Sequence, residues 1–207
     1  MSLRGAVLLS GSGRTLENFF ELAERGELPL DVRLVISSSR EAFGLQRAAR
    51  RGVAAVSLVR KEFGSHEAYS EAIFAACREA RVDVVLLAGF LKLLRPIPGD
   101  FQGKVLNIHP ALIPAFCGRG YYGDRVHQAV LDSGVEVTGC TVHFVDDEYD
   151  HGPIVLQRTV PVLAEDDVPT LADRVFAEET LAYPEAIRLF AAGRLKIEGR
   201  RVRVLAE

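Results

Sequence analysis

The chain has 207 residues, 48% of them hydrophobic, which is enough apolar material for the core of one large domain. Its net charge of −3 and pI near 6.0 exclude a protein that binds nucleic acid through bulk positive charge. Because the sequence has neither a signal-peptide pattern nor an apolar run of about 18 residues, we expect a cytoplasmic protein without a membrane segment. Three unevenly spaced cysteines predict reduced thiols rather than a disulfide framework or a metal site.

The first half of the chain alternates short apolar runs with amphipathic stretches, a pattern typical of successive βαβ units. Strands are predicted over residues 6–9, 32–37, 54–58, 82–88 and 104–108. Helices are predicted between them, over residues 16–25, 42–51 and 66–81. The run at 82–88 is apolar except for Asp83, which indicates a strand covered on both faces. We therefore expect an α/β fold with a Rossmann-like, mostly parallel central sheet flanked by helices.

The second half of the chain has a mixed pattern. It predicts a short helix over 126–133, strands over 139–145 and 154–160 joined by an acidic loop, a helix over 170–190, and a terminal hairpin over 196–204. Pro184 should kink or split the long helix near Tyr183. We expect one domain over residues 1–207, with a regular half over about 1–105 and a mixed C-terminal half over about 106–207.

Asn107 and His109 are the most informative polar residues, because they end a buried strand just before Pro110. Alternate residues of a strand share a face, so an amide and an imidazole point the same way. Proline cannot donate to a sheet ladder, so the strand should stop there. Open α/β sheets bind their ligands at this end of the strands. From these residues alone, a catalytic pair and a pair of satisfied strand-end residues are about equally supported.

A glycine-rich turn follows the first strand, and it contains Gly11, Ser12, Gly13, Arg14 and Thr15. Two glycines allow a tight turn whose N–H groups, with the start of the next helix, can bind a phosphate. The third glycine of the dinucleotide fingerprint is absent, and the second strand ends in serines without an acid for a ribose. This argues against a nicotinamide site, although an arginine at position 40 leaves a 2′-phosphate open. A purely structural turn is the alternative.

The acidic loop at 146–152 is usually read as a solvated surface turn. The alternative is that one of its carboxylates folds back onto His109, which would fix the ring and favour its protonated form. His143 and His151 lack the spacing of a zinc site, so we expect no metal.

Taken in order, these motifs resemble the phosphoribosylglycinamide formyltransferase family, the folate-dependent GAR transformylases. The resemblance covers nearly the whole chain. The segments that carry it are Ser10-Gly-Ser-Gly-x-x-Leu16, Ala42-Phe-Gly-Leu45, Val84-Val-Leu-Leu-Ala-Gly-Phe90, Leu106-Asn-Ile-His-Pro-Ala-Leu-Ile-Pro114, Thr138-Gly-Cys-Thr-Val-His-Phe-Val145, Asp150-x-Gly-Pro153 and Tyr183-Pro184. Asn-x-His-Pro together with Asp-x-Gly-Pro is specific to the formyltransferase superfamily.

The resemblance implies a single formyltransferase-type domain. It implies an enzyme that moves the formyl group of 10-formyltetrahydrofolate to the amine of N1-(5-phospho-D-ribosyl)glycinamide in de novo purine (IMP) synthesis, with no metal. The implied catalytic residues are Asn107, His109 and Asp150. The implied partners are these small molecules, with no nucleic acid and no membrane. A monomer and a homodimer both remain open.

The resemblance also implies binding residues, in a phosphate-binding N-terminal half and a folate-binding C-terminal half. The nucleotide contacts would be Gly11, Ser12, Gly13, Arg14, Thr15 and Glu179. The folate contacts would be His66, Leu91, Lys92, Leu93, Leu94, Asn107, Val145, Asp146 and Asp147. The chain departs from the family pattern at Arg14-Thr15, where Ser-Asn is usual, at His66, where Arg is common, and at His151, where a small residue is frequent. It also has an extended segment over 116–124.

Three other functions fit part of the pattern. A formyl-folate hydrolase shares the catalytic residues, but we expect none here because the first strand begins within a few residues of the N-terminus. A methionyl-tRNA formyltransferase would need a C-terminal RNA-binding domain, which we do not expect in a chain that stops at 207 with an acidic balance. A non-catalytic nucleotide-binding module explains the glycine turn, but it leaves Asn107, His109 and Asp150 as coincidence.

Overall fold

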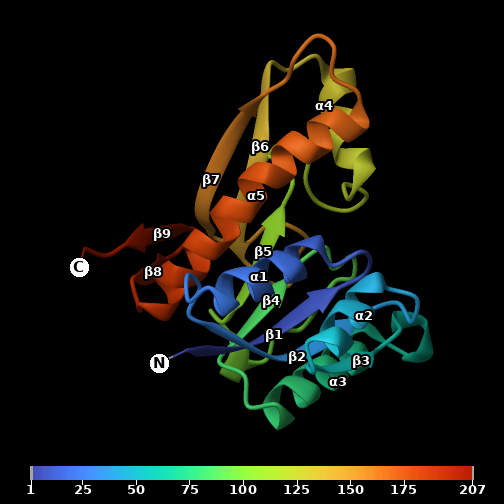
Figure 1. Cartoon of the computed structure of the whole chain (residues 1–207), viewed down its shortest axis with the longest axis vertical. Helices are drawn as coiled ribbons and strands as arrows, with labels where there is room; N and C mark the ends of the chain where they lie inside the picture. Colours follow the sequence, from blue (N-terminus) through green and yellow to red (C-terminus); the bar gives the residue numbers. More distant parts are fainter. Residues whose placement is uncertain (1, 207) are drawn as a thin grey trace. The chain divides into compact units, whose positions relative to one another are not determined.

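The computed structural model describes residues 2–206, which form two compact units (Figure 1). The first unit comprises the chain up to Asn107 together with Asp146–Glu148. The second comprises Ile108–Val145 and the chain from Tyr149 onward. The strand β5 (Val105–His109) runs from the first unit into the second, so the chain changes units within Asn107–His109.

The first unit contains a parallel sheet with the strand order β3-β2-β1-β4-β5. Besides β5, its strands are β1 (Leu3–Leu9), β2 (Leu30–Ser37), β3 (Ala54–Ser57) and β4 (Val84–Leu87). Its helices are α1 (Arg14–Glu24), α2 (Phe43–Arg50) and α3 (His66–Glu79), with the 3₁₀ turns η1 (Arg60–Glu62) and η2 (Gly99–Phe101). The order reverses at β1, as in Rossmann folds, and the predicted parallel α/β sheet is confirmed.

The central strands form the core of this unit. Residues 6–9 of β1 and 84–86 of β4 are fully buried, which confirms a strand covered on both faces at β4. Phe19 on α1 and Tyr69, Ile73 and Phe74 on α3 are also fully buried. Each such side chain contributes roughly 1.5–3 kcal/mol through burial. The strand β4 starts at Val84, later than predicted; the preceding Asp83 donates its N–H to the Arg4 carbonyl (2.7 Å) and forms an ion pair with the Arg4 side chain (Oδ1–Nη2 2.6 Å).

The second unit has the mixed character that the sequence predicts. It contains α4 (Asp124–Ser133), the antiparallel strands β6 (Val137–Phe144) and β7 (Ile154–Pro161), α5 (Val168–Ala191), and the hairpin β8 (Leu195–Glu198) with β9 (Arg201–Val204). The hairpin joins this sheet through β9, which pairs with β7 in parallel at Ile154 and Arg201. Helix α5 packs against β6 and β7 (Figure 1). Among residues 2–206, none of the helices has both the length and the apolar character that crossing a membrane requires.

Pro184 does not split the long helix. Helix α5 is continuous through it over 24 residues, so of the two predicted outcomes, a kink or a split, the split is wrong. Proline removes one backbone hydrogen bond and strains the preceding turn, at about 3 kcal/mol. Tyr183, Ala186 and Ile187 around it are fully buried, and their packing holds the helix together. The helix also begins earlier than predicted, because the Asp167 side chain accepts a hydrogen bond from the Thr170 N–H (2.9 Å) and caps it.

Candidate active site

The glycine turn at the end of β1 is held by contacts to its carbonyl groups. The Gly11 carbonyl accepts from the Gly44 N–H (3.1 Å), the Ser12 carbonyl from Arg47 Nε (3.0 Å), and the Gly13 carbonyl from the Glu17 N–H (3.0 Å). The first-turn N–H groups of a helix have no intrahelical partner, and α1 starts at Arg14, directly after this turn. The turn can therefore present N–H groups to an anion such as a phosphate.

Arg47 and Arg51, on and after α2, both form ion pairs with Glu17 of α1. Arg47 pairs with Glu17 (Nη1–Oε2 2.7 Å), and Arg51 pairs with the other oxygen of the same carboxylate (Nη2–Oε1 2.6 Å). The hydrogen bond from Arg47 is the largest cause that lowers the pKa of Glu17 below its ordinary value. Arg40, which follows the carboxyl end of β2, pairs with Glu62 (Nη2–Oε1 2.8 Å).

Gly13 lies in close contact with the backbone of Gly44, whereas a Cβ on Gly44 would meet the Leu9 side chain. Gly13 has a φ of 70°, and a Cβ placed on it would lie 2.7 Å from the Gly44 Cα. We expect Gly13→Ala to lower the free energy of unfolding by about 2 kcal/mol, from the left-handed φ and the backbone clash. The matched control is Gly11→Ala, whose Cβ would meet nothing within 4 Å, with an expected change below about 0.5 kcal/mol. Urea unfolding of both variants measures the difference, and equal losses would contradict this account.

The ends of three strands are tied together beside this turn. The Ser10 Oγ contacts the Ser38 Oγ (2.7 Å) and accepts from the Leu91 N–H (2.9 Å), and the Ser10 N–H donates to the Gly89 carbonyl (3.0 Å). These bonds connect the carboxyl ends of β1, β2 and β4. The reversal of strand order also falls here, between β1 and β4, which is where open α/β sheets bind ligands.

Asn107 lies at the same edge of the first unit's sheet. It pairs with Leu87 of β4, which in turn pairs with Leu8 of β1. Two strand spacings separate Asn107 from Leu8, so their Cα atoms are about 10 Å apart. Asn107 is half-buried. The amide therefore lies at the sheet edge that also carries the glycine turn.

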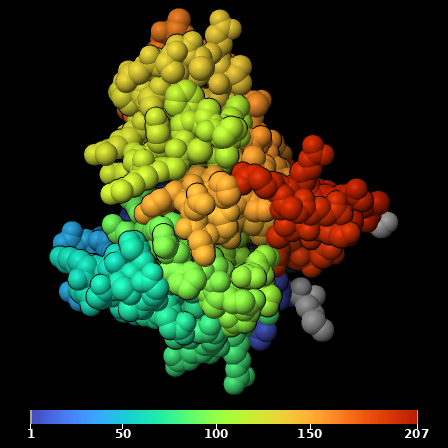
Figure 2. Space-filling view, turned by 180° about the vertical axis from the view of Figure 1, so that it is seen from behind, coloured from blue at the N-terminus to red at the C-terminus, as the bar shows by residue number. Residues whose placement is uncertain are grey.

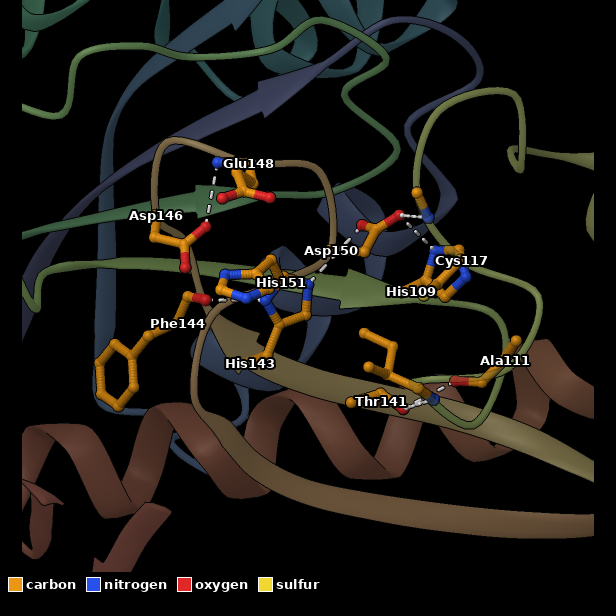
Figure 3. Close-up of polar contacts among 12 residues, drawn as sticks. His109, Ala111, Cys117, Thr141, His143, Phe144, Asp146, Glu148, Asp150 and His151 are labelled. Atoms are coloured by element: carbon orange, nitrogen blue, oxygen red, sulfur yellow. Dashed lines mark hydrogen bonds and ion pairs between the residues drawn. The ribbon is translucent and has the colours of Figure 1, made fainter. Parts of the chain in front are cut away.

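His109, two residues further along β5, is buried and belongs to the second unit. Its Nδ1 lies 3.5 Å from the Asp150 Oδ2, and its Nε2 lies 2.8 Å from the Phe116 carbonyl oxygen. Asp150 also accepts a hydrogen bond from the Gly118 N–H (2.9 Å). Figure 3 shows His109 and Asp150 pointing toward one another. The acidic loop thus does send one carboxylate to His109.

His143 on β6 approaches the other oxygen of the same carboxylate. Its Nε2 lies 3.8 Å from the Asp150 Oδ1, and its Nδ1 lies 2.7 Å from the Phe144 carbonyl oxygen (Figure 3). A carbonyl oxygen can only accept, so the proton of a neutral ring lies on Nδ1 of His143 and on Nε2 of His109. The nitrogens that face Asp150 then carry lone pairs. A proton taken up by either ring creates an ion pair with Asp150.

The net electrostatics of the pair differ from the prediction. Burial lowers the pKa of His109 below its ordinary value, although the Asp150 charge and the Phe116 carbonyl act in the opposite direction. The net direction favours the neutral ring because desolvation outweighs the carboxylate, although Asp150 acts in the predicted direction by favouring the protonated form. Burial also acts to raise the pKa of Asp150, but contacts with His143, His109 and Gly118 lower it overall. Asp150 is an ionised carboxylate at neutral pH.

Thr141 fixes the segment that follows His109. Its Oγ1 donates to the Ala111 carbonyl (2.7 Å) and accepts from the Ile113 N–H (3.1 Å) and from the Gln157 side chain (2.9 Å).

Sequence reasoning missed the roles of Thr141 and His143. A signal was present, since both are polar residues on one face of an apolar strand and both are buried. The backbone groups of Phe116 and Gly118 carry no such signal.

Most residues expected to contact folate lie in the first unit. His66 starts α3, is exposed, and its Nδ1 lies 3.4 Å from Arg60 Nε. In the segment after β4, Leu91 is 42% exposed and Leu94 is only 1% exposed, so Leu94 belongs to the core. Lys92 is exposed and Leu93 is half-buried.

Asp146 and Asp147, the acidic residues among the expected folate contacts, also belong to the first unit. Asp147 accepts a hydrogen bond from the Ile97 N–H (2.9 Å), which ties it to the segment containing Leu94. Asp146 accepts from the Glu148 N–H (3.0 Å). Val145 lies in the second unit and is half-buried. The structure therefore brings Asp147 together with the segment after β4.

Glu179 lies on α5 in the second unit and is half-buried. Burial first, and then the Glu179 charge, raise the pKa of the Cys140 thiol on β6 to about 12. Glu178 and Glu185 of the same helix form ion pairs with Arg158 (Oε2–Nη1 3.3 Å and Oε2–Nη2 2.7 Å). Among residues 2–206, no cluster of three or more His, Cys, Asp or Glu side chains is arranged to hold a metal ion.

The sequence and the structure of this chain are similar to those of known proteins. The family model described as formyl transferase matches residues 3–187. The phosphoribosylglycinamide formyltransferase of Escherichia coli (strain K12) is 40% identical over 192 residues, which cover 92% of this chain and 88% of that protein. The structure of glycinamide ribonucleotide transformylase 1 from Symbiobacterium toebii superposes with a TM-score of 0.90 at 44% identity, covering 99% of this chain and 95% of that one.

Longer relatives contain the same region. The trifunctional purine biosynthetic protein adenosine-3 of Gallus gallus is 38% identical over 93% of this chain, which spans only 19% of that protein's length. The family match and the identity along nearly the full E. coli enzyme show that this chain belongs to the formyl transferase family, among its phosphoribosylglycinamide formyltransferases.

Proposed function

We propose that the enzyme transfers the formyl group of 10-formyltetrahydrofolate to the primary amine of N1-(5-phospho-D-ribosyl)glycinamide, in de novo purine synthesis. The observation that carries this proposal is the buried His109–Asp150 pair, with Nδ1 and Oδ2 3.5 Å apart, at the end of the strand that also holds Asn107. The names of the E. coli and S. toebii relatives support the same acceptor.

The proposed binding roles are those that the family resemblance implies. Gly11, Ser12, Gly13, Arg14 and Thr15 would bind the phosphate of the ribonucleotide through the turn and the start of α1. Glu179 would contact its glycinamide part. The proposed folate contacts are His66, Leu91–Leu94, Asn107 and Val145–Asp147, of which only Val145 belongs to the second unit.

Bond formation would need no protein nucleophile. The amine nitrogen attacks the formyl carbon, which becomes tetrahedral and carries a negative oxygen. Asn107 can donate its amide N–H to this oxygen, and one such donor is typically worth ~10²–10³ in rate. The bond from the formyl carbon to the folate nitrogen then breaks, and that nitrogen needs a proton.

His109 would carry the proton from one nitrogen to the other. Its neutral resting state suits a base, since it can take the proton that the amine loses on attack and return it to the departing folate nitrogen. The Phe116 carbonyl holds Nε2 at 2.8 Å, so this contact must open before Nε2 can reach substrate. The ring proton then lies on Nδ1, facing Asp150, and Nε2 carries the lone pair.

A formyl-transfer assay tests the proposal. The enzyme is incubated with 10-formyltetrahydrofolate, with and without glycinamide ribonucleotide, and chromatography follows the formylated ribonucleotide and free formate. We expect formylated product only with the acceptor. Formate released at the same rate without the acceptor would favour a hydrolase, and no reaction in either arm would favour a binding module.

A further inference from the structure

His151 and Arg200 connect the segment that carries Asp150 to the terminal hairpin. The Arg200 Nη2 donates to the His151 carbonyl (3.0 Å), and its Nη1 lies 2.5 Å from the His151 Nε2. Arg200 lies between β8 and β9, in the same compact unit as Asp150. Figure 2 shows the hairpin in red at the surface, beside the light orange segment around residue 150. One guanidinium thus contacts both the backbone and the ring of the residue next to Asp150.

Asp150 needs such support because its backbone is strained. Its φ is 52°, in the left-handed region that non-glycine residues seldom adopt. Such a conformation persists only where the surroundings over-determine it. Gly152, two residues later, offers little resistance to rotation, since glycine has the freest backbone. Fixing the His151 carbonyl restrains the backbone directly after the strained Asp150.

The orientation of Asp150 has a chemical consequence. Its carboxylate must face the His109 Nδ1, 3.5 Å away, while it accepts a hydrogen bond from Gly118. We infer that Arg200 is a positioning residue that holds Asp150 opposite His109 through His151. The kinetic part of this inference rests on the proposed function, since Asp150 matters for turnover only if the pair is catalytic.

A purely structural role for the contact would be different, since Arg200 would then stabilise the hairpin and leave the pair unaffected. Arg203 provides the matched control. It lies in the same hairpin, pairs with Glu198 (3.7 Å), and its side chain is 68% exposed. Both substitutions remove one exposed arginine from the hairpin, but only Arg200 contacts His151.

The kinetic experiment compares Arg200→Ala, Arg200→Lys and Arg203→Ala. We expect Arg200→Ala to lower kcat about three- to tenfold with KM for the ribonucleotide unchanged within about twofold. This is less than the ~10² that a misplacement of 1 Å can cause, because the contact is exposed and weak. Lysine can still donate to the His151 carbonyl, so Arg200→Lys should recover most of the rate, and Arg203→Ala should match the wild type. Equal losses in Arg200→Ala and Arg203→Ala would overturn the inference.

A second readout does not depend on turnover. The Cε1–H signals of the five histidines are followed by NMR during a pH titration of the wild type and the Arg200→Ala variant. The Asp150 charge acts to raise the pKa of His109, so loosening Asp150 should lower that pKa further. An unchanged His109 titration would overturn the inference. If the wild type transfers no formyl group but Arg200→Ala still lowers the pKa of His109, the proposed function is refuted and the positioning role is retained.

Discussion

Replacing His109 by alanine should lower kcat by about 10²–10⁴, because general acid–base help of this kind typically contributes that factor. His109 is 4% exposed and contacts Asp150 and the Phe116 carbonyl, so it lies where a proton can be moved without access to bulk water. The glycine turn belongs to the other unit and has its own anchors at Gly44 and Arg47. Calorimetry should therefore give a Kd for the ribonucleotide within about twofold of the wild-type value.

A loss of fold must be separated from a loss of chemistry in this experiment. Alanine leaves a cavity and removes the partner of a buried carboxylate, so His109→Ala can lower stability as well. His109→Gln is the second variant, since it keeps most of the volume and an amide donor but cannot take up a proton. Both variants should be slow while their urea unfolding curves stay cooperative. Turnover near the wild-type rate in His109→Gln would rule out the proton-carrying role.

The parallel half of the fold was predictable because its signals are local. Four strands of the first unit, β1, β2, β4 and β5, are largely buried apolar runs, and each helix has its own apolar stripe. The succession of such units predicts a parallel sheet with right-handed crossovers, and the structure shows the order β3-β2-β1-β4-β5. The error at Pro184 has the opposite origin. Proline disfavours a helix interior, but the buried packing of Tyr183, Ala186 and Ile187 stabilises the helix, and this packing is a property of the tertiary structure.

The candidate site was predictable in its residues and not in its electrostatics. Strand alternation placed Asn107 and His109 on one face, and the family resemblance added Asp150, which lies 41 positions from His109 in the chain. The net charge of His109 depends on how deeply the ring is buried, and no pattern in the sequence measures that. The contacts of Phe116, Gly118 and Arg200 follow from the path of the loops, including the left-handed backbone at Asp150.

Asp150→Asn gives the second large effect, an expected loss of about 10²–10⁴ in kcat. The carboxylate orients the Nδ1–H of His109 and stabilises the imidazolium that forms when the ring takes the amine proton. An amide keeps the size but loses the charge, and its NH₂ group can face Nδ1 and fix the wrong tautomer. Glu148→Gln is the matched control, because it removes one charge from the same exposed acidic loop, and it should leave kcat unchanged.

The effect of Asp150→Asn on the pH profile of kcat/KM has a predicted direction. In the wild type the rate should fall as acid protonates His109, through a pKa below the ordinary histidine value near 6.5. The Asp150 charge raises that pKa, so its removal should move the acidic limb to still lower pH. The variant is then slower at neutral pH but keeps its remaining activity further into acid. A limb that moved to higher pH would mean that a group other than His109 loses its proton in the rate-determining step.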